Sequence, residues 1–258
     1  MKPLNQPQCS PGIIPGTHQS DSDGALGDHG FIWKVNLKEG TKARYAAFPK
    51  GPPSGLGWLP DGRMLAVHTS GLRELQVETA VGSGVFVQYC DLEAATGQGS
   101  GRTDDFLNDM VVGFDGTAYV DVEFNFYVPE AAGPRDIAMV SPDGKLAVQA
   151  GSQCIFPNGA MITPDGKTYI VAETFAAQLS AFDIGEDGSL SNKRVWADLR
   201  AAFHKNRPGY PDHFAFLPDG CCLDAEGCVW AAVPACDPTM STEFTGGFVR
   251  VAEGGEIK

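Results

Sequence analysis

A fourfold internal repeat restricts the fold of this sequence more than any other feature. The repeats start at residues 54, 108, 158 and 219. Each has a polar first residue, a short apolar run, an Asp-Gly or Glu-Gly pair seven positions after the start, and a second apolar run. Asp-Gly between two apolar runs is a strong signal for a β-hairpin, because glycine accepts the positive φ that the turn requires. The sequence therefore predicts four hairpins of one type.

The residues between these hairpins predict a second pair of strands in each of the first three repeats. The expected strands are 72–77 and 85–89, then 136–140 and 145–150, and then 178–184 and 189–197. Four strands in about 50 residues match one blade of a β-propeller, in which sheets surround a central channel. Residues 201–206 are expected to form at most one turn of helix.

The repeat pattern is incomplete at both ends. Two strands are expected before the first repeat, at 31–37 and 43–48, and one after the last hairpin, at 248–252. The predicted total is 17 strands, or about four and a quarter blades. Residues 1–29 are rich in Pro, Gly, Ser and Gln and are expected to be irregular. We therefore predict an all-β, propeller-type domain over residues 30–258 that lacks strands at each end.

The first residue of each repeat is a candidate site residue. The first strand of each propeller blade lines the channel, so equivalent positions converge although they lie far apart in sequence. These positions hold Ser54, Asn108, Asn158 and Asp219. Their amide and carboxylate oxygens suit a hard divalent cation such as Ca²⁺ or Mg²⁺. A local explanation also stands, because Asn, Asp and Ser often begin strands by bonding nearby backbone groups.

Several motifs resemble those of the gluconolactonase/regucalcin/luciferin-regenerating enzyme family, over about residues 31–256. They include Asn108-Asp109-Met110, Phe156-Pro157-Asn158-Gly159, Ala181-Phe182-Asp183 and Pro218-Asp219-Gly220. The resemblance implies a six-bladed propeller that binds one divalent cation on its axis. It implies that Asn158 and Asp219 bind the metal and that Asn108 faces the substrate. Ca²⁺ is the expected ion, with Zn²⁺, Mg²⁺ and Mn²⁺ as alternatives.

The activity implied by this resemblance is metal-dependent hydrolysis of a lactone in the channel. The cation would polarise the carbonyl group and lower the pKa of a bound water. Asp219 would be the catalytic residue that takes a proton from this water and returns it to the leaving ring oxygen. Asp212 lies in a similar Pro-Asp pair, but only Asp219 has the strand and turn in register. The alternative is a truncated or degenerate member that acts as a binding scaffold or not at all.

Two departures from the family pattern affect this expectation. The family has a glutamate ligand in its first blade, whereas the first acidic residue here is Asp21 and the first glutamate is Glu39, in an expected outer turn. Asp23 and Asp28 also lie in this region. Some members have an arginine two residues before the Asn-Asp motif, where this chain has Phe106. A more apolar lactone or ester is therefore a candidate substrate beside a sugar lactone.

Charge and composition disfavour several other classes of protein. A net charge of −13 makes nucleic acid a poor partner, because a polyanion repels phosphate groups. No apolar run approaches the roughly 18–20 residues of a membrane span, and residues 1–15 do not resemble a signal peptide. The seven cysteines contain no CxxC pair. They are expected to be structural thiols in a reducing compartment, the cytoplasm. The sequence leaves the oligomeric state open.

Overall fold

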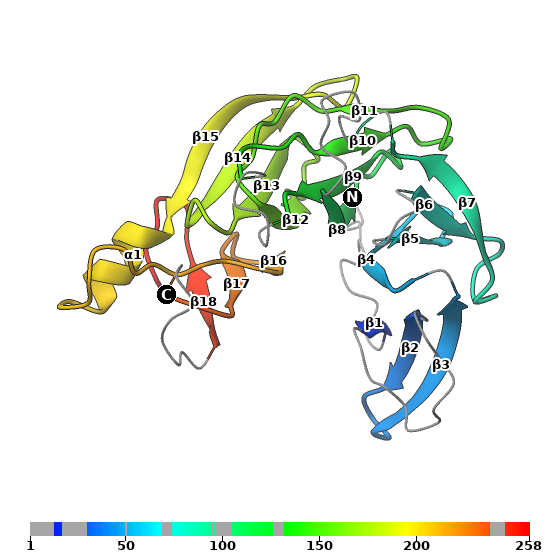
Figure 1. The fold of residues 1–258 in the computed structure, drawn as a ribbon, viewed down its shortest axis with the longest axis horizontal. Coiled ribbons are helices and arrows are strands. Elements are labelled where there is room, and N and C mark those ends of the chain that lie inside the picture. The colour runs from blue at the N-terminus through cyan, green and yellow to red at the C-terminus, as the bar shows by residue number, and fades with distance from the viewer. Residues whose placement is uncertain are drawn as a thin grey trace.

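In the computed structural model the chain forms five antiparallel β-sheets that follow one another around an open arc (Figure 1). The structure describes residues 13–16, 30–49, 51–68, 74–93, 95, 105–125, 132–237 and 246–258. The predicted all-β, propeller-type architecture is confirmed. The first sheet, β1–β3, lies at one end of the arc, and the fifth, β16–β18, lies at the other.

The five sheets contain the following strands. The first has β1 (Ile13–Gly16), β2 (Gly30–Asn36) and β3 (Thr41–Phe48). The second has β4 (Pro53–Trp58), β5 (Met64–His68), β6 (Glu74–Glu78) and β7 (Phe86–Asp91). The third has β8 (Phe106–Val112), β9 (Ala118–Glu123), β10 (Ala138–Val140) and β11 (Ala147–Gln149). The fourth has β12 (Pro157–Ile162), β13 (Thr168–Glu173), β14 (Gln178–Ile184) and β15 (Leu190–Asp198). The fifth has β16 (Cys221–Leu223), β17 (Val229–Val233) and β18 (Gly247–Val251).

Two local expectations differ from the structure. β1 lies within residues 1–29, where an irregular segment is expected, and it pairs antiparallel with β2. This pairing gives backbone partners to an edge of β2 that would otherwise be open, which a local pattern does not reveal. The expected single turn is a full helix, α1 (Leu199–Asn206). Asp198 caps this helix by accepting hydrogen bonds from two backbone N–H groups, and Leu199 and Phe203 are buried against the sheets.

The core consists of apolar layers between successive sheets. Ile32 packs in the layer between the first and second sheets, and Leu65 in the layer between the second and third. The rings of Tyr119 and Tyr169 lie between the third and fourth sheets, tilted by 48° to each other with centroids 5.2 Å apart. Full burial of such a side chain contributes about 1.5–3 kcal/mol. The layers therefore fix the order of the sheets and place β4, β8, β12 and β16 side by side on the concave side of the arc.

A β-bulge occurs at the start of three of the four repeats. In the third sheet Leu107 pairs with Val122 but Met110 pairs with Val120, so Asn108 and Asp109 together oppose Asp121. The same kind of register shift occurs after Pro53 and after Asn158 in the second and fourth sheets. A bulge turns side chains away from the regular alternation of a strand. These bulges aim the first residues of the repeats toward the neighbouring sheet.

Glycine follows the repeat start in three of the four repeats, and at two of them the adjoining sheet leaves no room for a side chain. A Cβ at Gly55 would lie 2.7 Å from the backbone nitrogen of Met110, and one at Gly159 would lie 2.3 Å from that of Cys221. Gly220 is the equivalent residue of the fifth sheet, and no heavy atom of the described residues lies within 4 Å of its ideal Cβ. The outer face of the fifth sheet is thus open in the described structure.

Two further expectations concern the cysteines and a membrane. The six described cysteines are all free thiols, and Cys9 lies outside the described residues. Within the described ranges, no helix has both the length and the apolar character needed to cross a membrane.

Candidate functional site

The structure joins the first residues of the four repeats in one series across four sheets. The Oγ of Ser54 donates to the backbone oxygen of Asn108 at 2.6 Å. The Nδ2 of Asn108 donates to the Oδ1 of Asn158 at 3.3 Å, and the Asn158 side chain also bonds to Asp219. The proximity that the repeat predicts is therefore present.

Asn158 is the most buried of these residues, at 6% exposure. Its Oδ1 also accepts a hydrogen bond from the Gly159 nitrogen at 3.0 Å. Its Nδ2 lies 3.5 Å from the Oγ1 of Thr174, which donates to the Pro218 oxygen at 2.7 Å. This network ties the fourth sheet to the residue that precedes Asp219, so the amide and the carboxylate are held together.

Asp219 is half-buried and precedes β16. Its nitrogen donates to the Ala232 oxygen at 2.9 Å, which anchors its backbone to β17. Burial raises the pKa of its carboxyl group, and hydrogen bonds from Gly220 and Asn158 offset part of this rise. Asp212, the other candidate aspartate, is exposed, and its carbonyl oxygen accepts a hydrogen bond from Arg200 at 3.3 Å. The structure thus places Asp219, and not Asp212, in the series.

Three further carboxyl groups, which the sequence analysis did not select, lie around Asn108. The Nδ2 of Asn108 donates to the Oε1 of Glu123 at 2.9 Å. Asp121 is completely buried, and Asp109 is the second residue of the bulge. A sequence signal exists for two of them. Asp121 and Glu123 alternate within an otherwise apolar strand, and the other repeats place Val67, Val171 and Ala232 where this one has Asp121.

These carboxyl groups raise one another's pKa. Burial raises the pKa of Glu123 to about 8, and the charges of Asp109 and Asp219 add to this effect. Burial and then the charge of Asp219 raise the pKa of Asp109 to about 6. Burial also raises the pKa of Asp121 well above its ordinary value. No ion pair between a basic side chain and any of these groups occurs in the described part of the chain. The site therefore brings together four carboxyl groups that have no cationic partner among the described residues, which disfavours their simultaneous ionisation.

Asp121 is the most deeply buried of these carboxyl groups. Its Oδ1 accepts a hydrogen bond from the Tyr169 hydroxyl at 3.3 Å. Its Oδ2 is buried and has no hydrogen-bond partner among the described residues. An ionised carboxylate in this environment is unfavourable, because a buried charge without a partner loses its hydration. Asp121 is therefore expected to hold a proton.

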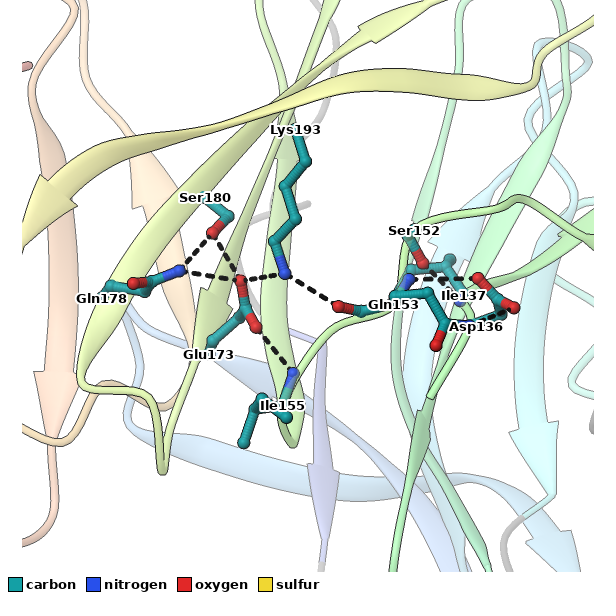
Figure 2. A network of polar contacts seen from close by, with 9 residues as sticks. All are labelled: Asp136, Ile137, Ser152, Gln153, Ile155, Glu173, Gln178, Ser180 and Lys193. Carbon is teal, nitrogen blue, oxygen red and sulfur yellow. Dashed lines mark hydrogen bonds and ion pairs between the residues drawn. The ribbon is translucent and has the colours of Figure 1, made fainter. Parts of the chain in front are cut away.

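Glu173, another buried carboxylate, shows what full pairing does (Figure 2). It lies 2.8 Å from the Lys193 ammonium and accepts hydrogen bonds from the Ser180 hydroxyl and, at 2.6 Å, from the Ile155 nitrogen. Burial alone would raise its pKa, but these partners outweigh burial and lower it. Glu173 is therefore a structural anion, whereas Glu123, with an amide partner, favours the protonated form.

The oxygen ligands around Asp219 fit a hard cation in kind. Asp219 supplies a carboxylate, and Asn158 has an amide oxygen, which accepts hydrogen bonds from Asn108 and Gly159 in this structure. A bound cation would favour the ionised forms of the neighbouring carboxyl groups. Within the described residues, no three Asp, Glu, His or Cys side chains are arranged to hold a metal ion. A cation at this position would therefore depend on amide oxygens. Glu39 is in an exposed turn, and Asp21, Asp23 and Asp28 lie outside the described residues.

Five sheets in an arc, with polar repeat starts joined on their inner strands, define an incomplete β-propeller. The sequence model of the SMP-30/gluconolactonase/LRE-like region matches residues 28–256, which is most of the chain. The chain belongs to this family. Membership supports hydrolysis of lactones as the activity at the level of the family.

Several solved structures share the fold. A luciferin-regenerating enzyme is 16% identical with a TM-score of 0.61, and covers 88% of this chain and 67% of its own length. A gluconolactonase from Xanthomonas campestris is 19% identical with a TM-score of 0.59, over 88% of this chain and 67% of its own. A regucalcin from Agrobacterium tumefaciens, described as a calcium-binding protein, is 20% identical with a TM-score of 0.57, over 79% and 60%. The chain thus spans between three fifths and about two thirds of these proteins.

Proposed function

We propose that the chain is a divalent-metal-dependent hydrolase of lactones, acting at the concave side of the arc, which corresponds to the central channel of a propeller. The observation that carries the proposal is the series of Asn108, Asn158 and Asp219, contributed by three successive sheets to one acidic site. A half-buried carboxylate beside polar amides offers both a base and groups that can orient a small polar substrate.

Asn158 and Asp219 are the proposed metal ligands. Ca²⁺ is the proposed ion, supported by the regucalcin neighbour, which is described as calcium-binding. Zn²⁺, Mg²⁺ and Mn²⁺ are alternatives. When bound, such a cation polarises a carbonyl oxygen and lowers the pKa of water. The surrounding carboxyl groups have no cationic partner among the described residues, and a nearby cation would favour their ionised forms, which supports a positive partner at this position.

The protein's own residues supply positioning and proton transfer. Asp219 accepts the proton of the attacking water, and Asn108 is the proposed substrate contact, since its amide faces the same site. Phe106 precedes this asparagine by two positions and is partly exposed, at 37%. An aromatic side chain there supports a lactone or ester that is more apolar than a sugar lactone. We propose no role for nucleic acid or a membrane. Free thiols at the six described cysteines support a reducing compartment such as the cytoplasm.

The test is pH-stat hydrolysis of gluconolactone, a γ-lactone and an aryl ester, each with and without added divalent cation. We expect metal-dependent turnover that Asp219→Asn reduces strongly, because the base and a ligand are lost together. Asp212→Asn is the matched control, since Asp212 is exposed and outside the site. Equal activity in the Asp219→Asn and unmodified proteins would contradict the proposal. Calorimetric titration with Ca²⁺ should show the same contrast between the two variants.

The second candidate function is that of a family member without catalysis, acting as a binding scaffold. The open face of the fifth sheet favours it, with Trp230 43% exposed and Phe248 77% exposed. Large exposed apolar side chains often mark interaction surfaces. A folded protein that hydrolyses none of the three substrates with any of the four cations would support this second function over the first.

A further inference from the structure

Three phenylalanine rings form a cluster next to the series of repeat-start residues. Phe124 directly follows β9, Phe156 directly precedes β12, and Phe175 lies shortly after β13. The centroid of the Phe156 ring lies 5.1 Å from that of Phe124 and 4.8 Å from that of Phe175, and the other two centroids are 6.0 Å apart. Aromatic rings at these separations are in contact. We call these three side chains the phenylalanine cluster, and it joins the third sheet to the fourth.

The cluster lies at the same end of the sheets as the repeat starts. β12 pairs antiparallel with β13, so the start of β12 lies beside the end of β13. Asn158 is the second residue after Phe156. Its Nδ2 lies 3.5 Å from the Oγ1 of Thr174, the residue before Phe175, and the Thr174 nitrogen donates to the Phe156 oxygen at 3.1 Å. Two rings of the cluster are therefore attached to the backbone that surrounds Asn158.

The remaining ring of the cluster belongs to the third sheet. Phe124 follows Glu123, whose Oε1 accepts a hydrogen bond from the Nδ2 of Asn108 at 2.9 Å. The guanidinium group of Arg135 lies 5.7 Å from the centroid of the Phe124 ring and forms a buried ion pair with Asp105 at 2.6 Å. This ion pair holds the guanidinium group in place, so the ring beside it is restricted as well. The cluster thus adjoins the residues that hold both amides of the series.

The connector from β11 to β12 imposes an unusual backbone conformation on the cluster. Phe156 has a φ of 54° and Gln153 a φ of 50°, a region that residues other than glycine rarely adopt. The Ile155 nitrogen donates to Glu173 at 2.6 Å, and the Lys193 ammonium donates to the Gln153 oxygen at 2.8 Å (Figure 2). Strained backbone persists where the surrounding structure enforces it, and it is common at functional sites. The strain at Phe156 therefore indicates that the position of this ring has a function.

The cluster is separate from the apolar layers that hold the sheets together. Phe124 and Phe156 are buried, but within the described residues none of the three rings belongs to a layer between sheets. Phe175 is half-buried, so part of its ring is open to a ligand. Apolar surface beside a few polar groups is the usual composition of a small-molecule site. The cluster and the neighbouring amides have this composition.

We propose that the phenylalanine cluster binds the apolar part of the substrate, and that the substrate is a lactone with an apolar substituent on its ring. The amides of Asn108 and Asn158 hold the polar acyl group, while the substituent contacts the accessible part of the Phe175 ring. Phe124 and Phe156 pack against that ring and fix its orientation. This assignment names the substrate class of the proposed function and rests on it.

The experiment compares kcat/KM for a γ-lactone without a substituent and for one with a pentyl substituent, each with Ca²⁺, Zn²⁺, Mg²⁺ or Mn²⁺ added. We expect the unmodified protein to favour the pentyl lactone by at least about tenfold, since one methylene group in an apolar site can change kcat/KM by about 10–200-fold. Phe175→Ala should lower this ratio by about tenfold. The change should come mainly from a higher KM for the pentyl lactone, because an apolar contact stabilises the ground state and the transition state alike. Phe175→Leu, which keeps an apolar side chain, should retain most of the ratio.

Phe114→Ala is the matched control, because Phe114 is half-buried like Phe175 but lies in the turn between β8 and β9, at the opposite end of the strands. A ratio that falls in Phe175→Ala and stays unchanged in Phe114→Ala supports the assignment. An unchanged ratio in Phe175→Ala, or an equal fall in Phe114→Ala, would overturn it while leaving lactone hydrolysis itself established.

The unmodified protein provides a test that does not depend on the folding of a variant. Hydrolysis of both lactones without a preference for the pentyl lactone would overturn the assignment and leave the proposed function standing. Failure to hydrolyse either lactone with any of the four cations would instead overturn the proposed function, and this assignment with it.

Discussion

Substitution of Gly159 by alanine tests the contact between the fourth and fifth sheets. The new Cβ would lie 2.3 Å from the Cys221 nitrogen and 2.7 Å from the Gly220 Cα. Non-bonded heavy atoms prefer separations of about 3.5–4.0 Å. The two inner strands would therefore have to separate by roughly 1 Å, and both contacts are backbone atoms that cannot rotate away. Overpacking of this kind typically costs about 1–3 kcal/mol.

Gly220→Ala is the matched control, since Gly220 occupies the equivalent position one repeat later. No heavy atom of the described residues lies within 4 Å of its ideal Cβ, and its φ lies outside the left-handed region. We expect this substitution to leave the free energy of unfolding unchanged or to raise it by up to about 1 kcal/mol, because alanine restricts the unfolded chain. The two variants thus make the same chemical change, once at a position that contacts the backbone of a neighbouring sheet and once at a position that does not.

Equilibrium unfolding in urea measures both effects. We expect Gly159→Ala to lower the midpoint without changing the slope, and to lower the melting temperature by about 2–4 °C per kcal/mol for a chain of this size. The Asn158–Asp219 contact crosses the same interface, so lactone hydrolysis should fall as well. Equal unfolding free energies for Gly159→Ala and Gly220→Ala would refute the reasoning, because the neighbouring sheet would then impose no steric limit.

Two further predictions concern the buried carboxyl groups. The folded-state pKa values of Glu123 and Asp109, about 8 and about 6, exceed the ordinary values of 4.5 and 3.8, so the folded protein binds more protons than the unfolded chain between these values. The free energy of unfolding of the metal-free protein is therefore greatest at acidic pH and falls as pH rises from about 5 to 8. Urea unfolding across this range measures the fall, which should be shallower in Glu123→Gln. An unfolding free energy that rises with pH would contradict the raised pKa values of these carboxyl groups. Lys193→Met should lower the unfolding free energy by about 1–3 kcal/mol because it leaves Glu173 buried without its cation. Arg194→Met, at an exposed pair, should cost less than about 1 kcal/mol, and equal costs would show that the pairing of Glu173 is dispensable.

The sequence determines the hairpins because their causes are local. Asp-Gly turns and alternating apolar residues need no distant partner, and the expected outer strands agree with the observed ones to within two residues at each end. The repeat also predicts that Asn108, Asn158 and Asp219 lie close together, since equivalent residues of stacked sheets face one axis. β1 has no such local cause, because its partner β2 begins 14 residues later in the chain. The length of α1 depends on burial of Leu199 and Phe203 against other sheets.

The tertiary structure alone decides whether each buried carboxyl group favours its protonated or its ionised form. Glu123 and Glu173 are the same residue type, and each is the last residue of the second strand in its sheet. The fourth sheet brings Lys193 from β15 to Glu173 and lowers its pKa, whereas Glu123 meets Asn108 and neighbouring acids and has its pKa raised. Charge interactions act through space and are strong where water is excluded. The protonation state of each carboxyl group therefore depends on the residues within a few ångströms of it, and those residues can lie far away in the sequence.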